Sequence, residues 1–164
     1  MSQGSHSYTG GKGKECGKTQ CIQTQRKRYA GGVGSDLSTR KKGESRKKII
    51  AFDEAFHGET FGAMSVSGDH ELFTAFEDHL FSVDRIPAPL PGREEIAYHQ
   101  LEALLETGEV AAFIFEPLVM GAGGMLMYTP EHLDRLIALC HQYGAMCIAD
   151  EVMTGFYRTG KVFA

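Results

Sequence analysis

The sequence of 164 residues has no apolar run of membrane-spanning length, although 42% of its residues are hydrophobic. A helix needs about 20 apolar residues to cross a bilayer, so a transmembrane segment is not predicted. No charged stretch followed by an apolar one marks a secretory leader. We therefore predict a globular protein of the cytoplasm, long enough to form one domain with an apolar core.

Cysteine is scarce, with four in the chain: Cys16, Cys21, Cys140 and Cys147. Their spacing does not match that of a zinc or iron–sulfur ligand set, so no metal site is predicted. Cys140 and Cys147 lie among apolar residues and are expected to be small members of the core. Free thiols agree with a reducing compartment.

Apolar residues are sparse at the start of the chain, where positive charge accumulates. Residues 1–50 hold 12 Lys and Arg against 3 Asp and Glu, whereas residues 51–164 hold 5 against 18. Such a change in composition separates two unlike parts of a chain. We predict that residues 1–46 form a basic segment, disordered or translated out of frame, and that residues 47–164 form part of a folded domain.

The basic segment contains two weak functional signals. The stretch KGKECGKT at Lys12–Thr19 supplies the second half of a phosphate-binding P-loop, but no apolar strand precedes it and no amphipathic helix follows. Clusters at Arg26–Arg28 and Arg40–Lys42 suit a nucleic-acid-binding arm, for which only Tyr29 offers an aromatic ring to stack on a base. We favour a solvated basic tail, and we do not expect the chain to bind nucleic acid.

The second part alternates between strands and helices. Three short apolar runs predict buried strands, at residues 48–52, 110–115 and 145–149. Stripes of apolar residues predict helices within Gly92–Thr107 and from Pro130 to Gly144, the second opening on proline and closing on glycine. Between the first strand and the first of these helices, Asp69–Leu90 is predicted to be irregular, with an apolar face that comprises Leu72, Phe73, Phe76, Leu80 and Phe81.

Functional side chains follow the ends of these three strands. Phe56 and His57 follow the first, Glu116 and a glycine-rich loop follow the second, and Asp150 ends the third. The second and third strands flank a helix in a βαβ unit, so they run parallel and bring Glu116 and Asp150 to one edge of a sheet. In the alternative interpretation Asp150 only caps a loop and Glu116 pairs with an arginine.

An aromatic residue and a buried acid in one cleft suit a ring that carries a protonated nitrogen. Pyridoxal phosphate has such a ring, and an acid paired with its nitrogen makes the cofactor an electron sink. The stretches AFHGETFGAMSVSG, FIFEPLVMGAGGMLMYTPEHL and IADEVMTGFYRTGKVFA, in this order within residues 47–164, resemble the class III aminotransferases, which are pyridoxal phosphate enzymes of fold type I.

The resemblance implies an α/β fold, namely part of the three-layer large domain with a mainly parallel sheet. It also implies pyridoxal phosphate as cofactor, small-molecule substrates and a homodimer in the full-length family. By position, it implies that Asp150 pairs with the pyridine nitrogen and that Phe56 stacks on the ring beside His57. Val152 would press on the other face of the ring, and Glu116 would order the site.

Within the class, the motifs are most similar to the branch that acts in biotin synthesis. This implies transfer of an amino group from S-adenosylmethionine to 8-amino-7-oxononanoate. Enzymes acting on ornithine, acetylornithine or 4-aminobutyrate are alternatives, as is a non-catalytic remnant. The Schiff-base lysine of the family lies on a later strand, beyond Ala164. We therefore expect this chain to be an inactive fragment without a catalytic residue of its own.

Overall fold

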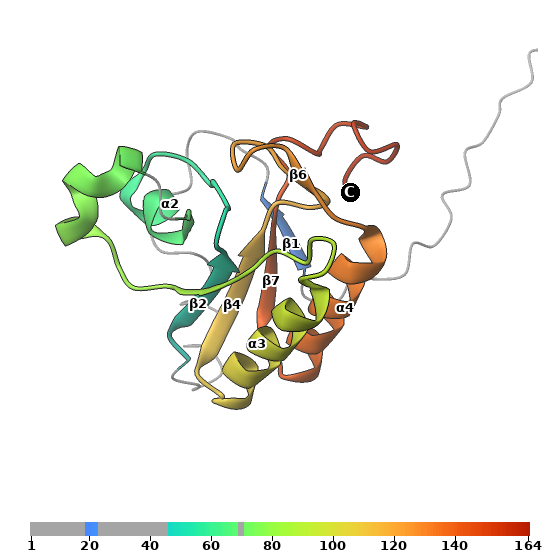
Figure 1. Ribbon diagram of the computed structural model, residues 1–164, viewed down its shortest axis with the longest axis horizontal. Helices are drawn as coiled ribbons and strands as arrows, with labels where there is room; N and C mark the ends of the chain where they lie inside the picture. The colour runs from blue at the N-terminus through green and yellow to red at the C-terminus, as the bar shows by residue number, and fades with distance from the viewer. Residues whose placement is uncertain (1–18, 23–45, 69–70) are drawn as a thin grey trace, which may run out of the picture.

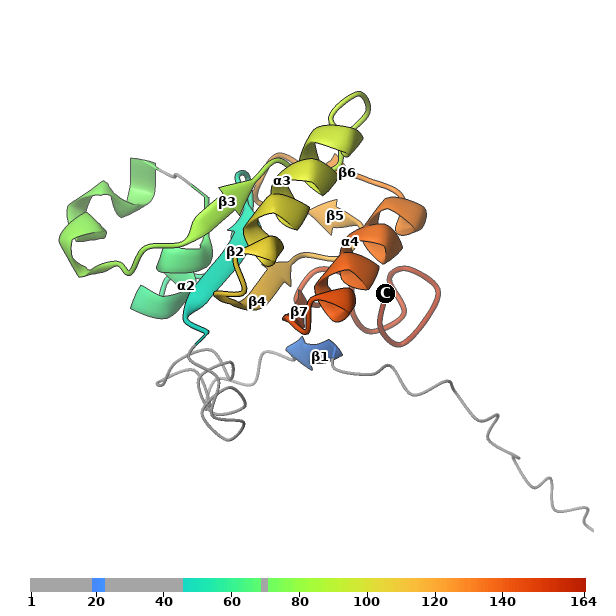
Figure 2. The same cartoon turned by 90° about the horizontal axis from the view of Figure 1, so that it is seen from below.

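The computed structural model describes residues 19–22, 46–68 and 71–164. Its main sheet has five strands in the order β1-β7-β4-β2-β3, and every neighbouring pair is parallel. These strands are β1 (Thr19–Ile22), β2 (Lys48–Phe52), β3 (Asp84–Ile86), β4 (Val110–Phe115) and β7 (Met146–Asp150). Helices α3 (Glu94–Glu106) and α4 (Pro130–Gln142) cover one face of the sheet, and α2 (Phe61–Val66) lies on the other, as Figures 1 and 2 show.

The central strand β4 explains why the sheet is covered on both faces. All six of its residues, VAAFIF, are buried, as expected for a parallel strand between two layers. Alternate side chains point to opposite faces, so Phe113 and Phe115 pack toward α3 and α4, whereas Ile114 packs with Val66 of α2. The predicted α/β architecture with a mainly parallel sheet is thereby confirmed.

The βαβ unit predicted from the sequence is present as β4, α4 and β7. Its helix ends in a Schellman motif: the Ala145 N–H donates to Cys140 O at 2.8 Å, and the Gly144 N–H donates to His141 O at 3.1 Å. Gly144 takes a φ of 74°, which glycine adopts without strain. The chain therefore turns directly into β7, where Cys147 lies opposite Phe113 of β4.

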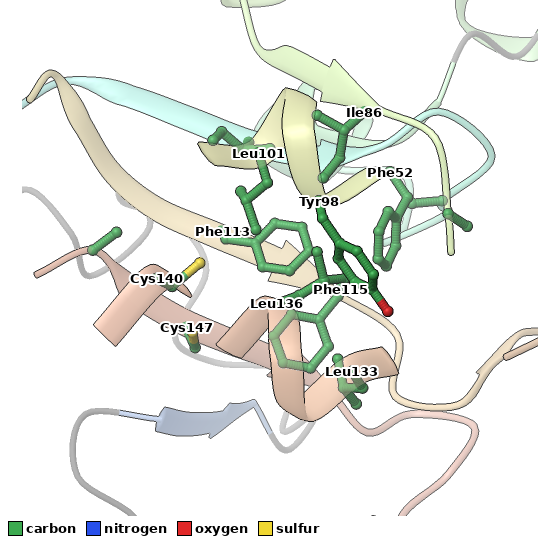
Figure 3. Packing of buried hydrophobic residues seen from close by; sticks show 14 of the residues in the cluster. Phe52, Ile86, Tyr98, Leu101, Phe113, Phe115, Leu133, Leu136, Cys140 and Cys147 are labelled. Carbon is green, nitrogen blue, oxygen red and sulfur yellow. The ribbon is translucent and has the colours of Figure 1, made fainter. Parts of the chain in front are cut away.

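The larger part of the core lies between the sheet and the helices α3 and α4 (Figure 3). The Phe52 ring meets the Phe113 ring edge to face, with centroids 5.2 Å apart. Cys140 and Cys147 are fully buried free thiols in this cluster, as predicted. A hydrogen bond with Cys147, together with burial, raises the pKa of Cys140, so both act as small core residues.

The region between α2 and α3 differs from the prediction. Residues 71–79 form a 3-10 helix, η1 (Glu71–His79), and β3 adds a parallel edge strand to β2. Of the predicted apolar face, Phe73 is buried, but Phe76 and Phe81 are exposed. The prediction of an irregular segment was wrong because β3 has three residues with a single buried apolar one, too few to show a periodic pattern.

Two other elements also lack a sequence signal. The glycine-rich loop forms an antiparallel hairpin of β5 (Val119–Met120) and β6 (Leu126–Met127). β1 pairs with β7 at the edge of the sheet opposite to β3, so these four residues form a strand where a disordered or out-of-frame segment was predicted. Backbone pairing needs no apolar pattern, which is why the sequence did not predict β1. The P-loop-like residues 12–18 and the two basic clusters lie outside the described residues.

Candidate functional site

The predicted site residues meet at the carboxyl ends of β2, β4 and β7. The His57 side chain follows β2, Glu116 follows β4, and Asp150 is the last residue of β7. All three side chains are withdrawn from solvent: Glu116 and Asp150 are buried residues, and the His57 side chain is 2% exposed. Ligands of open α/β sheets bind at this edge, so the convergence marks a candidate site.

Asp150 and His57 form the centre of the site. Asp150 Oδ2 lies 2.8 Å from His57 Nδ1, and Asp150 Oδ1 accepts a hydrogen bond from the Val152 N–H at 3.1 Å. Each carboxylate oxygen can accept two hydrogen bonds, so this arrangement leaves acceptor capacity on both oxygens. A buried carboxylate with spare acceptor capacity suits a cationic N–H group.

The second imidazole nitrogen, His57 Nε2, is buried and has no hydrogen-bond partner among the described residues. A buried polar atom without a partner is costly, because it has lost water and gained nothing in return. The carboxylate of Asp150 fixes the ring through the other nitrogen. We interpret His57 as the residue that orients Asp150 and presents a further polar atom to the site.

Ser67, which the sequence pattern did not reveal, holds the backbone of His57. Its Oγ accepts a hydrogen bond from the His57 N–H at 2.9 Å and donates to Ala63 O at 2.8 Å. Arg85 Nη2 donates to Ser67 O at 2.7 Å, which ties this end of α2 to β3. The signal available in the sequence was the serine followed by Gly68, where a Cβ would lie 1.9 Å from Asp53 O.

Glu116 joins two loops of the site. Its Oε1 accepts a hydrogen bond from the Phe56 N–H at 3.1 Å, and its Oε2 accepts one from the Gly121 N–H at 3.0 Å. Burial raises the pKa of Glu116, while the two backbone N–H groups act in the opposite direction. These partners are backbone amides of the loop after β2 and of the hairpin, so Glu116 orders the loops rather than serving an arginine.

Glycines allow the hairpin to approach the loop after β2. A Cβ on Gly123 would lie 2.2 Å from Glu54 O, so the backbone contact requires glycine. Gly124 takes a φ of 99°, in the region that favours glycine. The glycine-rich loop thus combines a close backbone approach at Gly123 with a positive φ at Gly124.

Phe56 and Val152 flank this centre. The Phe56 ring stacks on Phe73 of η1 with centroids 6.0 Å apart and an interplanar angle of 19°. Val152 follows Asp150 closely in the chain and exposes 59% of its surface, which is high for valine. Their roles as contacts of a ring remain predictions.

The residues fit a cofactor with a protonated aromatic nitrogen. The site offers the buried Asp150 carboxylate with spare acceptor capacity, the orienting imidazole of His57 and the half-buried phenyl ring of Phe56.

Within the described ranges, no cluster of three or more His, Cys, Asp or Glu residues is arranged to hold a metal ion. In that part of the chain, no helix combines the length and apolar composition that a bilayer crossing requires.

Comparison with known proteins gives consistent matches. A model of the class-III aminotransferases matches residues 33–164. The adenosylmethionine-8-amino-7-oxononanoate aminotransferase of Synechococcus elongatus is 50% identical over 130 residues, which cover 74% of this chain and 30% of that protein. The chain thus spans about 30% of the length of this curated relative.

Solved structures agree with the sequence matches. The adenosylmethionine-8-amino-7-oxononanoate aminotransferase of Methanocaldococcus jannaschii superposes with a TM-score of 0.70 at 32% identity, covering 79% of this chain and 30% of that one. An ornithine aminotransferase of Toxoplasma gondii, described with partial occupancy of pyridoxal phosphate at its active site, gives a TM-score of 0.66 at 28% identity, covering 79% and 29%.

Proposed function

Because this chain belongs to the class-III aminotransferase family, we propose that it is part of an enzyme that transfers amino groups with pyridoxal phosphate as cofactor. The name shared by the Synechococcus and Methanocaldococcus relatives supports a more specific activity. That activity is transfer of the amino group of S-adenosylmethionine to 8-amino-7-oxononanoate in biotin synthesis. Residues 47–164 would then form part of the large, cofactor-binding domain, to which β1 adds an edge strand.

The observation that carries the proposal is the buried pair of Asp150 and His57 at the carboxyl end of β7. Pyridoxal phosphate, when bound, supplies an electron sink for the bond that is broken at the substrate carbon. The role of Asp150 is to keep the pyridine nitrogen protonated by accepting its hydrogen bond in a site of low polarity. His57 holds the Asp150 carboxylate in place through Nδ1.

The neighbouring residues would shape the rest of the site. Phe56, supported by Phe73, would stack on one face of the pyridine ring, and Val152 would contact the other. Glu116 would keep the loop that carries Phe56 and the hairpin at Gly121 at a fixed separation. These residues bind and orient, and none of them is assigned a proton transfer.

An ornithine-type aminotransferase is the second candidate. The Toxoplasma ornithine aminotransferase has a similar backbone over 79% of this chain, although its identity of 28% is below the 50% of the Synechococcus relative. Both candidates share the site around Asp150. They differ in the amino donor and acceptor, so the cofactor test below applies to either.

We also propose a cytoplasmic homodimer. The aromatic rings of Phe61 on α2 and Phe76 on η1 meet edge to face at 6.1 Å and are both exposed. Two neighbouring exposed rings on α2 and η1 suit an apolar contact with a second copy of the chain. Sedimentation of the wild-type protein and of a Phe61→Ser, Phe76→Ser variant tests this contact, which a monomeric wild-type protein would contradict.

The function is tested by titrating the purified chain with pyridoxal phosphate and following the His57 and Val152 signals by NMR, which detects binding into the millimolar range. We expect binding, and an affinity about 10-fold to 100-fold weaker in Asp150→Asn, because a charge-assisted hydrogen bond of about 1.5 to 3 kcal/mol is lost. Asp134→Asn, an exposed change on α4, serves as the matched control.

A second ligand separates recognition of the ring nitrogen from recognition of phosphate. Phenyl phosphate has the phosphate and an aromatic ring but no pyridine nitrogen. We expect the wild-type chain to prefer pyridoxal phosphate over phenyl phosphate and Asp150→Asn to lose this preference. Equal affinity of wild type and Asp150→Asn for pyridoxal phosphate, or no binding to the wild type, would contradict the proposal.

A further inference from the structure

Glu151 is a second buried acid beside Asp150, and the proposed function gives it no role. Its residue surface is 3% exposed, close to that of Thr154 at 1%. Thr154 Oγ1 donates to Glu151 Oε2 at 2.6 Å, and the Ala164 N–H lies 3.0 Å from Oε1 and 3.2 Å from Oε2. Glu151 therefore binds both the start and the far end of the segment that follows β7.

These contacts close residues 152–164 into a loop. The Gly155 N–H donates to Glu151 O at 2.9 Å, and the Phe156 N–H donates to Val162 O at 2.8 Å across the loop. A Cβ on Gly155 would lie 2.8 Å from Glu151 O, so the first turn is tightly packed on the backbone of Glu151. The loop is visible beyond the end of β7 in Figure 1.

The tip of the loop takes an unusual backbone conformation. Phe156 and Tyr157 have φ values of 60° and 67°, and their side chains are largely exposed. Non-glycine residues rarely adopt positive φ, and such strain persists only where surrounding contacts determine the conformation. The contacts of Glu151 and the Phe156–Val162 hydrogen bond close the loop behind this tip, and at the tip itself the Gly160 N–H donates to Tyr157 O at 3.1 Å.

We propose that Glu151 is a positioning residue that clasps the loop 152–164 to the end of β7 and thereby fixes Val152 beside Asp150. The two adjacent acids have different partners: Asp150 binds His57, and Glu151 binds Thr154 and Ala164. Consecutive side chains at a strand end point to opposite sides, which explains this division. The link to the cofactor through Val152 rests on the proposed function, whereas the clasp itself does not.

Limited trypsin digestion tests the clasp, because Arg158 and Lys161 both lie in the loop and are exposed. In Glu151→Gln, an NH2 group replaces one carboxylate oxygen, and in either amide orientation it faces the Ala164 N–H, which both oxygens now accept from. We expect cleavage after Arg158, followed by mass spectrometry, to be about fivefold faster than in wild type. Glu106→Gln, an exposed change on α3, should cleave at the wild-type rate.

A single tryptophan provides an independent readout. The chain has no tryptophan, so Phe156→Trp places one reporter at the tip of the loop. Adding Glu151→Gln should lower its emission anisotropy while the circular dichroism melting curve keeps its cooperative transition. If Glu151→Gln does not fold, Thr154→Val removes only one hydrogen bond of the clasp and is expected to give the same changes at about half the size.

The possible outcomes separate the clasp from the cofactor site. Unchanged cleavage and anisotropy in folded Glu151→Gln and Thr154→Val would overturn the clasp. Faster cleavage together with a changed circular dichroism of bound pyridoxal phosphate would support the positioning of Val152. Faster cleavage with unchanged cofactor dichroism would overturn that positioning while leaving the clasp. A wild-type chain that binds no pyridoxal phosphate rejects the proposed function, and the digestion still decides the clasp.

Discussion

Charged residues are used in opposite ways at the two ends of the strands of the main sheet, the carboxyl ends (the carboxyl edge) and the amino ends (the amino edge). At the carboxyl edge, Asp150, His57 and Glu116 are withdrawn from water and hydrogen-bonded to one another or to nearby backbone. At the amino edge, Lys48 opens β2 and lies 2.8 Å from Glu109, with 44% and 60% of these side chains exposed. Both edges belong to the same strands, so the difference lies in the loops that follow or precede them.

This difference indicates where the sequence is constrained by function. Exposed ion pairs are screened by water and contribute little to stability, so the amino edge has little need of particular residues. Buried polar groups lose water on folding and are costly unless each finds a partner. A set of buried polar groups with acceptor capacity left over, as at the carboxyl edge, is therefore typical of a binding site.

The largest expected effect on stability concerns Gly123, which lies in the β5–β6 hairpin and packs against the loop after β2 at the carboxyl edge. Gly123→Ala places a Cβ where only 2.2 Å separates it from Glu54 O, so the hairpin must move away from the loop after β2. We expect a loss of about 3 kcal/mol in the free energy of unfolding, as for overpacked sites, measured by urea denaturation.

Gly62→Ala is the matched control for this substitution. Gly62 lies in α2, no atom lies within 4 Å of the position that an alanine methyl would take, and its φ is not in the left-handed region. Alanine favours a helix over glycine, so we expect a gain of about 0.5 to 1 kcal/mol. Equal effects of the two substitutions would show that the carboxyl edge is no more tightly packed than an open helix surface.

The elements that could be predicted from the sequence are those with a strong local pattern. β2 and β4 have the predicted bounds, and α4 begins at Pro130 with its Schellman glycine at position 144. β3 and the β5–β6 hairpin have two or three residues in each strand, and the pairing of β3 depends on a strand distant in the sequence. Such short strands carry no periodicity of their own.

The candidate site also has a part that could be predicted from the sequence and a part that could not. The rule that parallel strands bring their carboxyl ends together predicted that Glu116 and Asp150 lie at one edge of the sheet, and the structure confirms this and places His57 against Asp150. The supporting contacts of Ser67 and Glu151 were not predicted. They depend on the conformations of two loops, which follow from tertiary packing rather than from residue spacing.

An intermediate effect is expected at Glu116. In Glu116→Gln, a single amide oxygen cannot accept from both the Phe56 and Gly121 N–H groups, so one partly buried donor loses its acceptor. We expect a loss of about 1 to 3 kcal/mol at neutral pH, measured by urea denaturation. Glu106→Gln, an exposed change on α3, should leave the free energy of unfolding unchanged.

The pH dependence of this loss follows from the pKa of Glu116, which burial raises above its ordinary value. Between the ordinary and the raised pKa, the folded protein binds more protons than the unfolded one, so the contribution of Glu116 to stability falls as pH rises. The difference in the free energy of unfolding between wild type and Glu116→Gln should therefore decrease from about pH 4.5 toward neutral pH. A difference that increases over this range would contradict the assignment.

The smallest effect is expected at the amino edge. The hydrogen bond between Lys48 and Glu109 raises the pKa of Lys48 and lowers the pKa of Glu109, so both groups are fully charged at neutral pH. Both are also open to solvent, where screening removes most of the attraction. Lys48→Met should leave the melting temperature unchanged within the error of measurement, in low and in high salt, and Glu109→Gln should behave alike. A destabilisation as large as that of Glu116→Gln would remove the contrast between the edges, because it would show that an exposed pair stabilises this sheet as much as a buried one.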